Sequence, residues 1–126
     1  MSTALRQLAA QLREEDTPIS PHVVEPDEAA TFAPPGEYDL VIEAVREGYL
    51  LHYGEPRLLA GHDADLALLA GDYLYALGIE RLATLGDTNA VHRLADLIST
   101  CAQLHSEGRD DDVPGEWERT VEALTS

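Results

Sequence analysis

The sequence contains no lysine, and its 8 basic residues, all arginines, stand against 24 aspartates and glutamates. The resulting formal charge of -16 repels nucleic-acid phosphates and the surfaces of anionic membranes. We therefore expect no nucleic-acid partner. An acidic surface of this kind could hold divalent cations loosely. The absence of lysine favours a compositional origin of the charge, such as a high-salt or high-GC source.

The chain also has a single cysteine and no long apolar run. Cys101 lies within the apolar pattern of a predicted helix and cannot form an internal disulfide, so nothing indicates an oxidising compartment. No stretch approaches the roughly 20 apolar residues of a membrane span. Residues 1–16 carry arginine and glutamine within an amphipathic pattern, which is unlike a secretory signal. We expect a cytoplasmic protein without membrane insertion.

The length of 126 residues predicts one all-α domain, residues 1–126. A first helix is predicted in residues 1–16, with Thr3 as its cap. The five prolines of residues 17–36 exclude a long regular helix there. Apolar residues within this proline-rich arm leave two interpretations open, an ordered arm or a flexible linker. Residues 37–126 are expected to form the helical core.

The longest apolar pattern runs from His62 to Glu107 and predicts a central antiparallel helical hairpin in a small bundle of about five helices. Gly86 is a typical helix stop, and Asp87 begins a typical cap for the next helix. Gly71 and Gly78 interrupt the first helix of the hairpin, each at a cost of about 1 kcal/mol relative to alanine. They predict either a tight helix crossing within the fold or the seam of a dimer.

Two further helices are predicted on either side of this hairpin. Between Glu37 and His52, apolar residues mark one face of a helix, while Glu43, Arg46 and Glu47 mark its polar face. A short closing helix is predicted from Pro114 onward, because proline is favoured in a first helical turn.

His52, His62 and Asp63 could together hold a divalent metal ion and activate a water molecule, as metal-dependent phosphohydrolases do. Such sites need further ligands from neighbouring helices, and Asp63 is also a typical helix cap, so this function ranks as the last alternative. Asp110–Asp112 could bind Mg²⁺ through carboxylate oxygens. Consecutive carboxylates after a helix point in different directions, so a solvated acidic turn is favoured and no cofactor is expected.

Several short segments, in order along the chain, resemble the trans-isoprenyl diphosphate synthase family. The segment ALLAGDYL at 67–74 is similar to the start of a core helix in these enzymes, and YGEPR at 53–57 resembles the Arg-Gly-x-Pro turn before it. The matches cover residues 47–108, about half of the chain. Downstream they continue through Leu82-Ala83, Gly86-Asp87, Leu94-Ala95 and Ser106-Glu107-Gly108.

The resemblance implies an isoprenoid-synthase-like fragment whose helices surround a prenyl cavity and help to form a dimer interface. Members of the family hold their diphosphate through Mg²⁺ bound by two Asp-Asp-x-x-Asp motifs, because the leaving-group charge must be neutralised. Neither motif occurs in this sequence. Arg57 is the one residue at a plausible position for a second diphosphate. The chain is therefore similar to the small non-catalytic subunit of two-component polyprenyl synthases.

We predict a non-catalytic accessory or regulatory protein that forms a homodimer, or a heterodimer with a catalytic polyprenyl synthase. The first alternative is a module that binds a small hydrophobic ligand between the hairpin and the helix of residues 38–53. The candidate ligand-binding residues are Tyr49, His52, Arg57 and Tyr73. The candidate interface residues are Leu69, Gly71, Tyr73, Leu77, Ile98 and Ala102.

Overall fold

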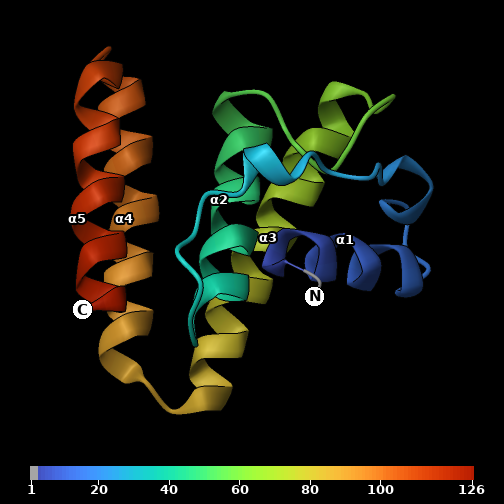
Figure 1. The fold of residues 1–126 in the computed structure, drawn as a ribbon. Helices are drawn as coiled ribbons and strands as arrows, with labels where there is room; N and C mark the ends of the chain where they lie inside the picture. Colours follow the sequence, from blue (N-terminus) through green and yellow to red (C-terminus); the bar gives the residue numbers. More distant parts are fainter. Residues whose placement is uncertain (1–2) are drawn as a thin grey trace. The chain divides into compact units, whose positions relative to one another are not determined.

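The computed structural model describes residues 3–126, in which five α-helices and three short 3₁₀ helices form and no strand occurs (Figure 1). The predicted all-α class is confirmed. The chain divides into two compact units, one running to Gly78 and the other comprising Ile79–Ser126. Among the helices of the described residues, none has the length and apolar character needed to cross a membrane. The helices are α1 (Ala4–Glu14), α2 (Asp39–Tyr53), α3 (Ala64–Leu85), α4 (Thr88–Ser106) and α5 (Val113–Thr125).

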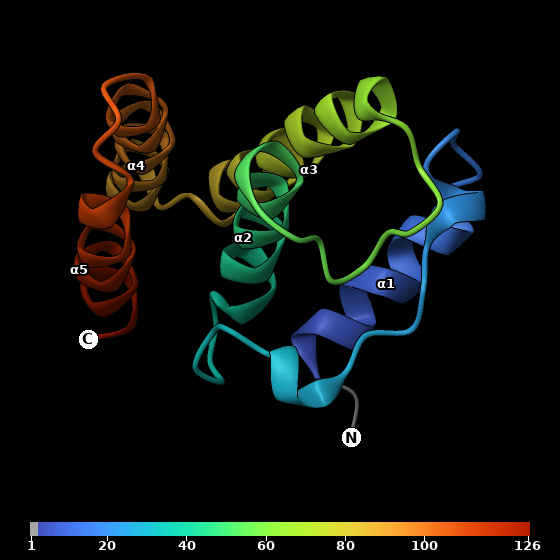
Figure 2. The ribbon, with the colours of Figure 1, turned by 90° about the horizontal axis from the view of Figure 1, so that it is seen from above.

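Helix α1 begins at the predicted cap. The Thr3 hydroxyl accepts a hydrogen bond from the backbone N–H of Arg6 at 3.2 Å, which satisfies one of the free donors of the first turn. The leucines that recur at helical spacing, Leu5, Leu8 and Leu12, are fully buried in the core of the first unit. Helix α1 contacts α2, and this stripe lies in the core to which both helices contribute; Figure 2 shows the two helices in the first unit.

Helix α2 is the most deeply buried element of the first unit, since ten of its 15 residues are buried. The sequence pattern placed residues 62–107 at the centre of the chain, whereas within this unit α2 occupies that position. One side of α2, represented by Leu40, Ala44 and Leu51, joins the core that α1 also enters. Another side meets α3. Burial on several sides explains why the helix has apolar residues almost all round.

The crossing of α2 and α3 depends on glycine. A Cβ atom on Gly48 would lie 2.8 Å from the carbonyl oxygen of Gly71, and one on Gly78 would lie 2.6 Å from Cγ2 of Val45. Both distances are shorter than real Cβ contacts, so only glycine allows the two helices to approach so closely. Of the two roles predicted for Gly71 and Gly78, the structure shows the tight crossing within the fold.

The proline-rich arm follows a defined path over the first unit, with 3₁₀ turns at Ser20–His22 and Glu28–Ala30. It pairs with the loop that precedes α3. The N–H of Val24 donates to the carbonyl of Leu58 at 2.7 Å, and an N–H of that loop donates to the carbonyl of His22 at 3.0 Å. Of the two interpretations left open by the sequence, the structure therefore shows the ordered arm.

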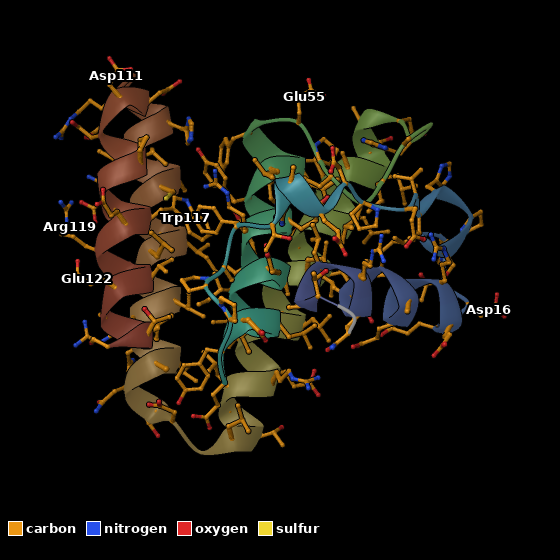
Figure 3. The ribbon with its side chains drawn as sticks, viewed as in Figure 1. Asp16, Glu55, Asp111, Trp117, Arg119 and Glu122 are labelled. Carbon is orange, nitrogen blue, oxygen red and sulfur yellow. The ribbon has the colours of Figure 1, made fainter. Side chains whose placement is uncertain are left out.

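In the second unit, α4 and α5 lie side by side and antiparallel (Figures 1 and 2). The joint before α4 matches the prediction: Gly86 has φ +80°, and the Asp87 carboxylate accepts a hydrogen bond from the N–H of Ala90 at 3.0 Å. Trp117 is buried and projects from the side of α5 opposite Arg119 (Figure 3). The packing predicted between α3 and α4 remains a prediction, because α3 begins in the other unit.

Candidate functional site

Two glutamates on α2, Glu43 and Glu47, are completely buried, although they belong to the predicted polar face of the helix. Backbone donors from two other segments satisfy one oxygen of each carboxylate. Glu43 accepts from the N–H groups of Phe32 and Ala33 at 2.8 and 3.1 Å. Glu47 accepts from the two N–H groups of residues 57–58 at 2.8 and 2.9 Å. Burial is possible because each negative charge has several donors around it.

Arg57 supplies the positive charge between these two carboxylates. Its Nη1 donates to Glu43 at 2.7 Å and its Nε to Glu47 at 2.9 Å. Nη1 and Nη2 also donate to the backbone carbonyls of Ala30 and Glu43, at 3.0 and 3.3 Å. The side chain is only 10% exposed, and each guanidinium nitrogen has an acceptor within the chain. Arg57 therefore fastens the arm and the loop to α2, and its ligand-binding role stays a prediction.

Sequence reasoning missed this network, although the sequence contains a signal for it. Glu43 and Glu47 are spaced by four residues inside the run LVIEAVREGYLL, which is otherwise mostly apolar. A carboxylate pair in such a run needs a cation nearby. The chain has 8 basic residues against 24 acidic ones, and one of the basic residues, Arg57, follows the helix closely.

His52 lies at the crossing of α2 and α3. Its Nε2 is 3.0 Å from a carboxylate oxygen of Asp72, and its ring stacks on Tyr75 with centroids 5.4 Å apart. The imidazole also covers Gly71, where a Cβ atom would lie 2.6 Å from Nε2. These contacts give His52 a packing role between the two helices.

Of the residues predicted for metal-dependent hydrolysis, His52 and Asp63 have separate contacts, and the buried Nδ1 of His62 has no hydrogen-bond partner in the described part of the chain. The Asp63 carboxylate caps α3 by accepting from the N–H of Leu66 at 2.8 Å, as its alternative interpretation predicted. Asp110–Asp112 form a 3₁₀ helix, in which Asp112 pairs with Arg109 at 2.9 Å. Nowhere in residues 3–126 are three or more histidine, cysteine, aspartate or glutamate side chains arranged to hold a metal ion. The structure does not gather His52 and Asp63 into such a group.

The tyrosines predicted to line a ligand cavity contact other parts of the chain. Tyr49 is almost fully buried, with the guanidinium of Arg46 5.4 Å from its ring centroid and the ring of Tyr53 at 5.2 Å. The Tyr73 hydroxyl donates to the carboxylate of Glu15 at the end of α1. Tyr49 therefore packs along its own helix α2, and Tyr73 joins α3 to the end of α1.

The cavity predicted between α2 and α3 is filled at the crossing, where even a methyl group on Gly48 or Gly71 has no room. The second unit contains a hollow of about 350 Å³ beside the start of α5, lined mainly by charged side chains. Its two arginines are already ion-paired, Arg119 with Glu116 at 2.7 Å and Arg109 within its own turn. Such a lining does not suit a hydrophobic ligand.

The outer face of α3 carries two exposed leucines. Leu68 and Leu69 are 53% and 57% exposed, and we call them the Leu68–Leu69 patch. Helical spacing places Asp65, Asp72 and Ala76 on the same face, and all three are exposed. The opposite side of the helix packs into the core. The patch is therefore the one place on α3 within the first unit where large apolar side chains face away from the protein's own core.

The predicted interface residues are distributed over both units. Leu69 lies in the patch, and Gly71 is buried against α2. Tyr73 and Leu77 are partly buried and pack against the core of the first unit. On α4, Ile98 is partly buried and Ala102 is exposed. Sequence reasoning missed Leu68, although two adjacent leucines on a helix differ by about 100° in direction and cannot both face one narrow core stripe.

Comparisons with protein-family models, curated proteins and solved structures found no match to this chain.

Proposed function

We propose that this chain is a non-catalytic helical protein that acts by binding another polypeptide through the Leu68–Leu69 patch. The observation that supports this function is the exposure of both leucines, each by more than half, on a helix whose opposite side enters the core. Contiguous exposed apolar surface with a polar rim marks protein–protein contact sites. A partner that covers them removes their apolar surface from water.

Two observations support the non-catalytic part of the proposal. The sequence lacks both paired-aspartate motifs of the enzymes that it resembles. Arg57, which occupies the plausible position for a diphosphate, donates from all its guanidinium nitrogens to acceptors within the chain. An accessory subunit needs the shape of such a helical protein but not its catalytic groups.

The sequence resemblance identifies the partner to test first, a catalytic polyprenyl synthase that carries both aspartate motifs. The double substitution Leu68→Ser and Leu69→Ser removes the patch from an exposed face. Leu85→Ser is the matched control, because Leu85 is 49% exposed near the other end of α3. We expect the double variant to lose co-purification with the synthase, whereas the control keeps it.

Light scattering on the same three proteins tests self-association. A complex with the synthase, or with a second copy, that persists unchanged in the double variant would overturn the proposed role of the patch. Circular dichroism of each variant checks that the helices remain folded.

A further inference from the structure

We infer that the Leu68–Leu69 patch receives a basic amphipathic helix of a different protein. This inference rests on the proposed function and adds the chemistry of the partner. It follows from the charges that share the outer face of α3 with the two leucines. A partner must match both the apolar centre and the acidic surroundings of this face.

The acidic residues lie one helical turn on either side of the leucines. Asp65 precedes Leu68 by three residues and Leu69 by four, and Asp72 follows them at four and three. These spacings place all four side chains on one face. The side chain of Asp72 is 76% exposed, so its charge faces solvent although one oxygen contacts His52. Between Ala64 and Gly78, α3 contains no arginine that would neutralise this face.

A helix of the partner can match this pattern of two leucines with an aspartate one turn away on either side. Its apolar residues at spacings of three and four can contact the two leucines, while arginines or lysines one turn away reach Asp65 and Asp72. The aliphatic stems of those long side chains also cover apolar surface beside the leucines. The same arrangement brings opposite charges together at the edge of the contact, where they accelerate and select the encounter.

A second copy of this chain does not satisfy these conditions. A symmetric dimer places the same surface on both subunits, so Asp65 and Asp72 of one copy would face the acidic residues of the other. Each copy also carries a formal charge of -16, which opposes association over longer distances. The charges therefore favour a basic partner over self-association.

Two labelled peptides of about 20 residues test this inference in fluorescence anisotropy with the full chain. Both form an amphipathic helix with the same leucine stripe, and one carries arginines where the other carries glutamates. We expect the arginine peptide to bind and the glutamate peptide not to bind. The substitutions Asp65→Asn and Asp72→Asn together should weaken binding about tenfold, and added salt should weaken it further.

The matched control for net charge is the pair Glu118→Gln and Glu122→Gln, two exposed residues of α5. It removes the same charge from another surface, and we expect less than about a twofold change. Equal effects of the two pairs would show attraction by overall charge alone and would overturn the inference. Failure of the arginine peptide to bind at about 100 μM, or equal binding of the glutamate peptide, would also overturn it.

The inference and the proposed function fail in different ways. A wild-type dimer that dissociates in the Leu68→Ser, Leu69→Ser variant would overturn the basic partner but keep the patch as a binding surface. Unchanged binding of both the arginine peptide and the polyprenyl synthase by that variant would overturn the proposed function itself.

Discussion

Helices α2 and α3 of the first unit depart from the ordinary burial pattern in opposite directions. Helix α2 buries two acidic side chains, Glu43 and Glu47, whereas α3 exposes two large apolar ones, Leu68 and Leu69. The first exception is compensated inside the chain, because Arg57 and four backbone N–H groups surround the carboxylates. The second exception is not compensated within the chain, because each leucine remains more than half exposed. The buried carboxylates belong to the internal architecture of the unit, whereas we propose that the exposed apolar pair binds a partner.

The largest effect is expected from removal of the internal cation. Arg57→Ala leaves two buried carboxylates without their ion pair, which typically costs about 3–5 kcal/mol in the free energy of unfolding. Urea unfolding followed by circular dichroism measures it. Arg81→Ala, at an exposed position of α3, is the control and should change stability by less than about 0.5 kcal/mol. Similar stability of the two variants would contradict the role of Arg57 as a fastener.

The crossing that holds α2 against α3 is tested next. In Gly48→Ala the new methyl group would meet the backbone oxygen of Gly71 at 2.8 Å, so the helices must separate. We expect a loss of about 1–3 kcal/mol in thermal or urea unfolding. Gly36→Ala is the control, since a Cβ atom there meets nothing within 4 Å. A neutral Gly48→Ala variant would mean that the two helices are not in such close contact.

The cap of α3 determines where the helix begins and therefore which side chains share its outer face. Asp63→Ala removes the acceptor for the N–H of Leu66 and should cost about 1 kcal/mol. Asp63→Asn keeps an acceptor oxygen at the same position and should cost much less. Equal unfolding midpoints for the two variants would show that the cap contributes nothing to the stability of α3.

Local signals in the sequence were sufficient for several elements of the fold. The stripe on α1, the Thr3 cap and the Gly86 stop each depend on residues within one or two helical turns, and the structure confirms them. The first turn of α5, which contains Pro114, is confirmed for the same reason. Such signals are short-range, and their physical cause lies in the backbone itself.

The parts that sequence reasoning missed depend on contacts between distant segments. Spacing did not show that the polar face of α2 is buried, because Arg57, ten residues after Glu47, and the arm at Phe32 become its neighbours only in the folded unit. The candidate ligand-binding residues looked like the lining of a cavity for a related reason. Spacing alone does not show that Gly48 and Gly71 bring α2 and α3 into direct contact.

The smallest effect on stability is expected at the patch, where the largest effect on binding should occur. Leu68→Ser together with Leu69→Ser removes no core contact, so the free energy of unfolding should fall by less than about 1 kcal/mol, mainly through helix propensity. Leu74→Ala, on the buried side of the same helix, should instead cost about 2–5 kcal/mol, because Leu74 is fully buried.

The most direct test of the central claim is to measure unfolding and partner binding side by side for the Leu68→Ser, Leu69→Ser variant. We expect a nearly unchanged urea midpoint together with the loss of binding to the arginine peptide and to the polyprenyl synthase. A marked drop in the midpoint with unchanged binding would contradict the account, because the two leucines would then belong to the core and not to a binding surface.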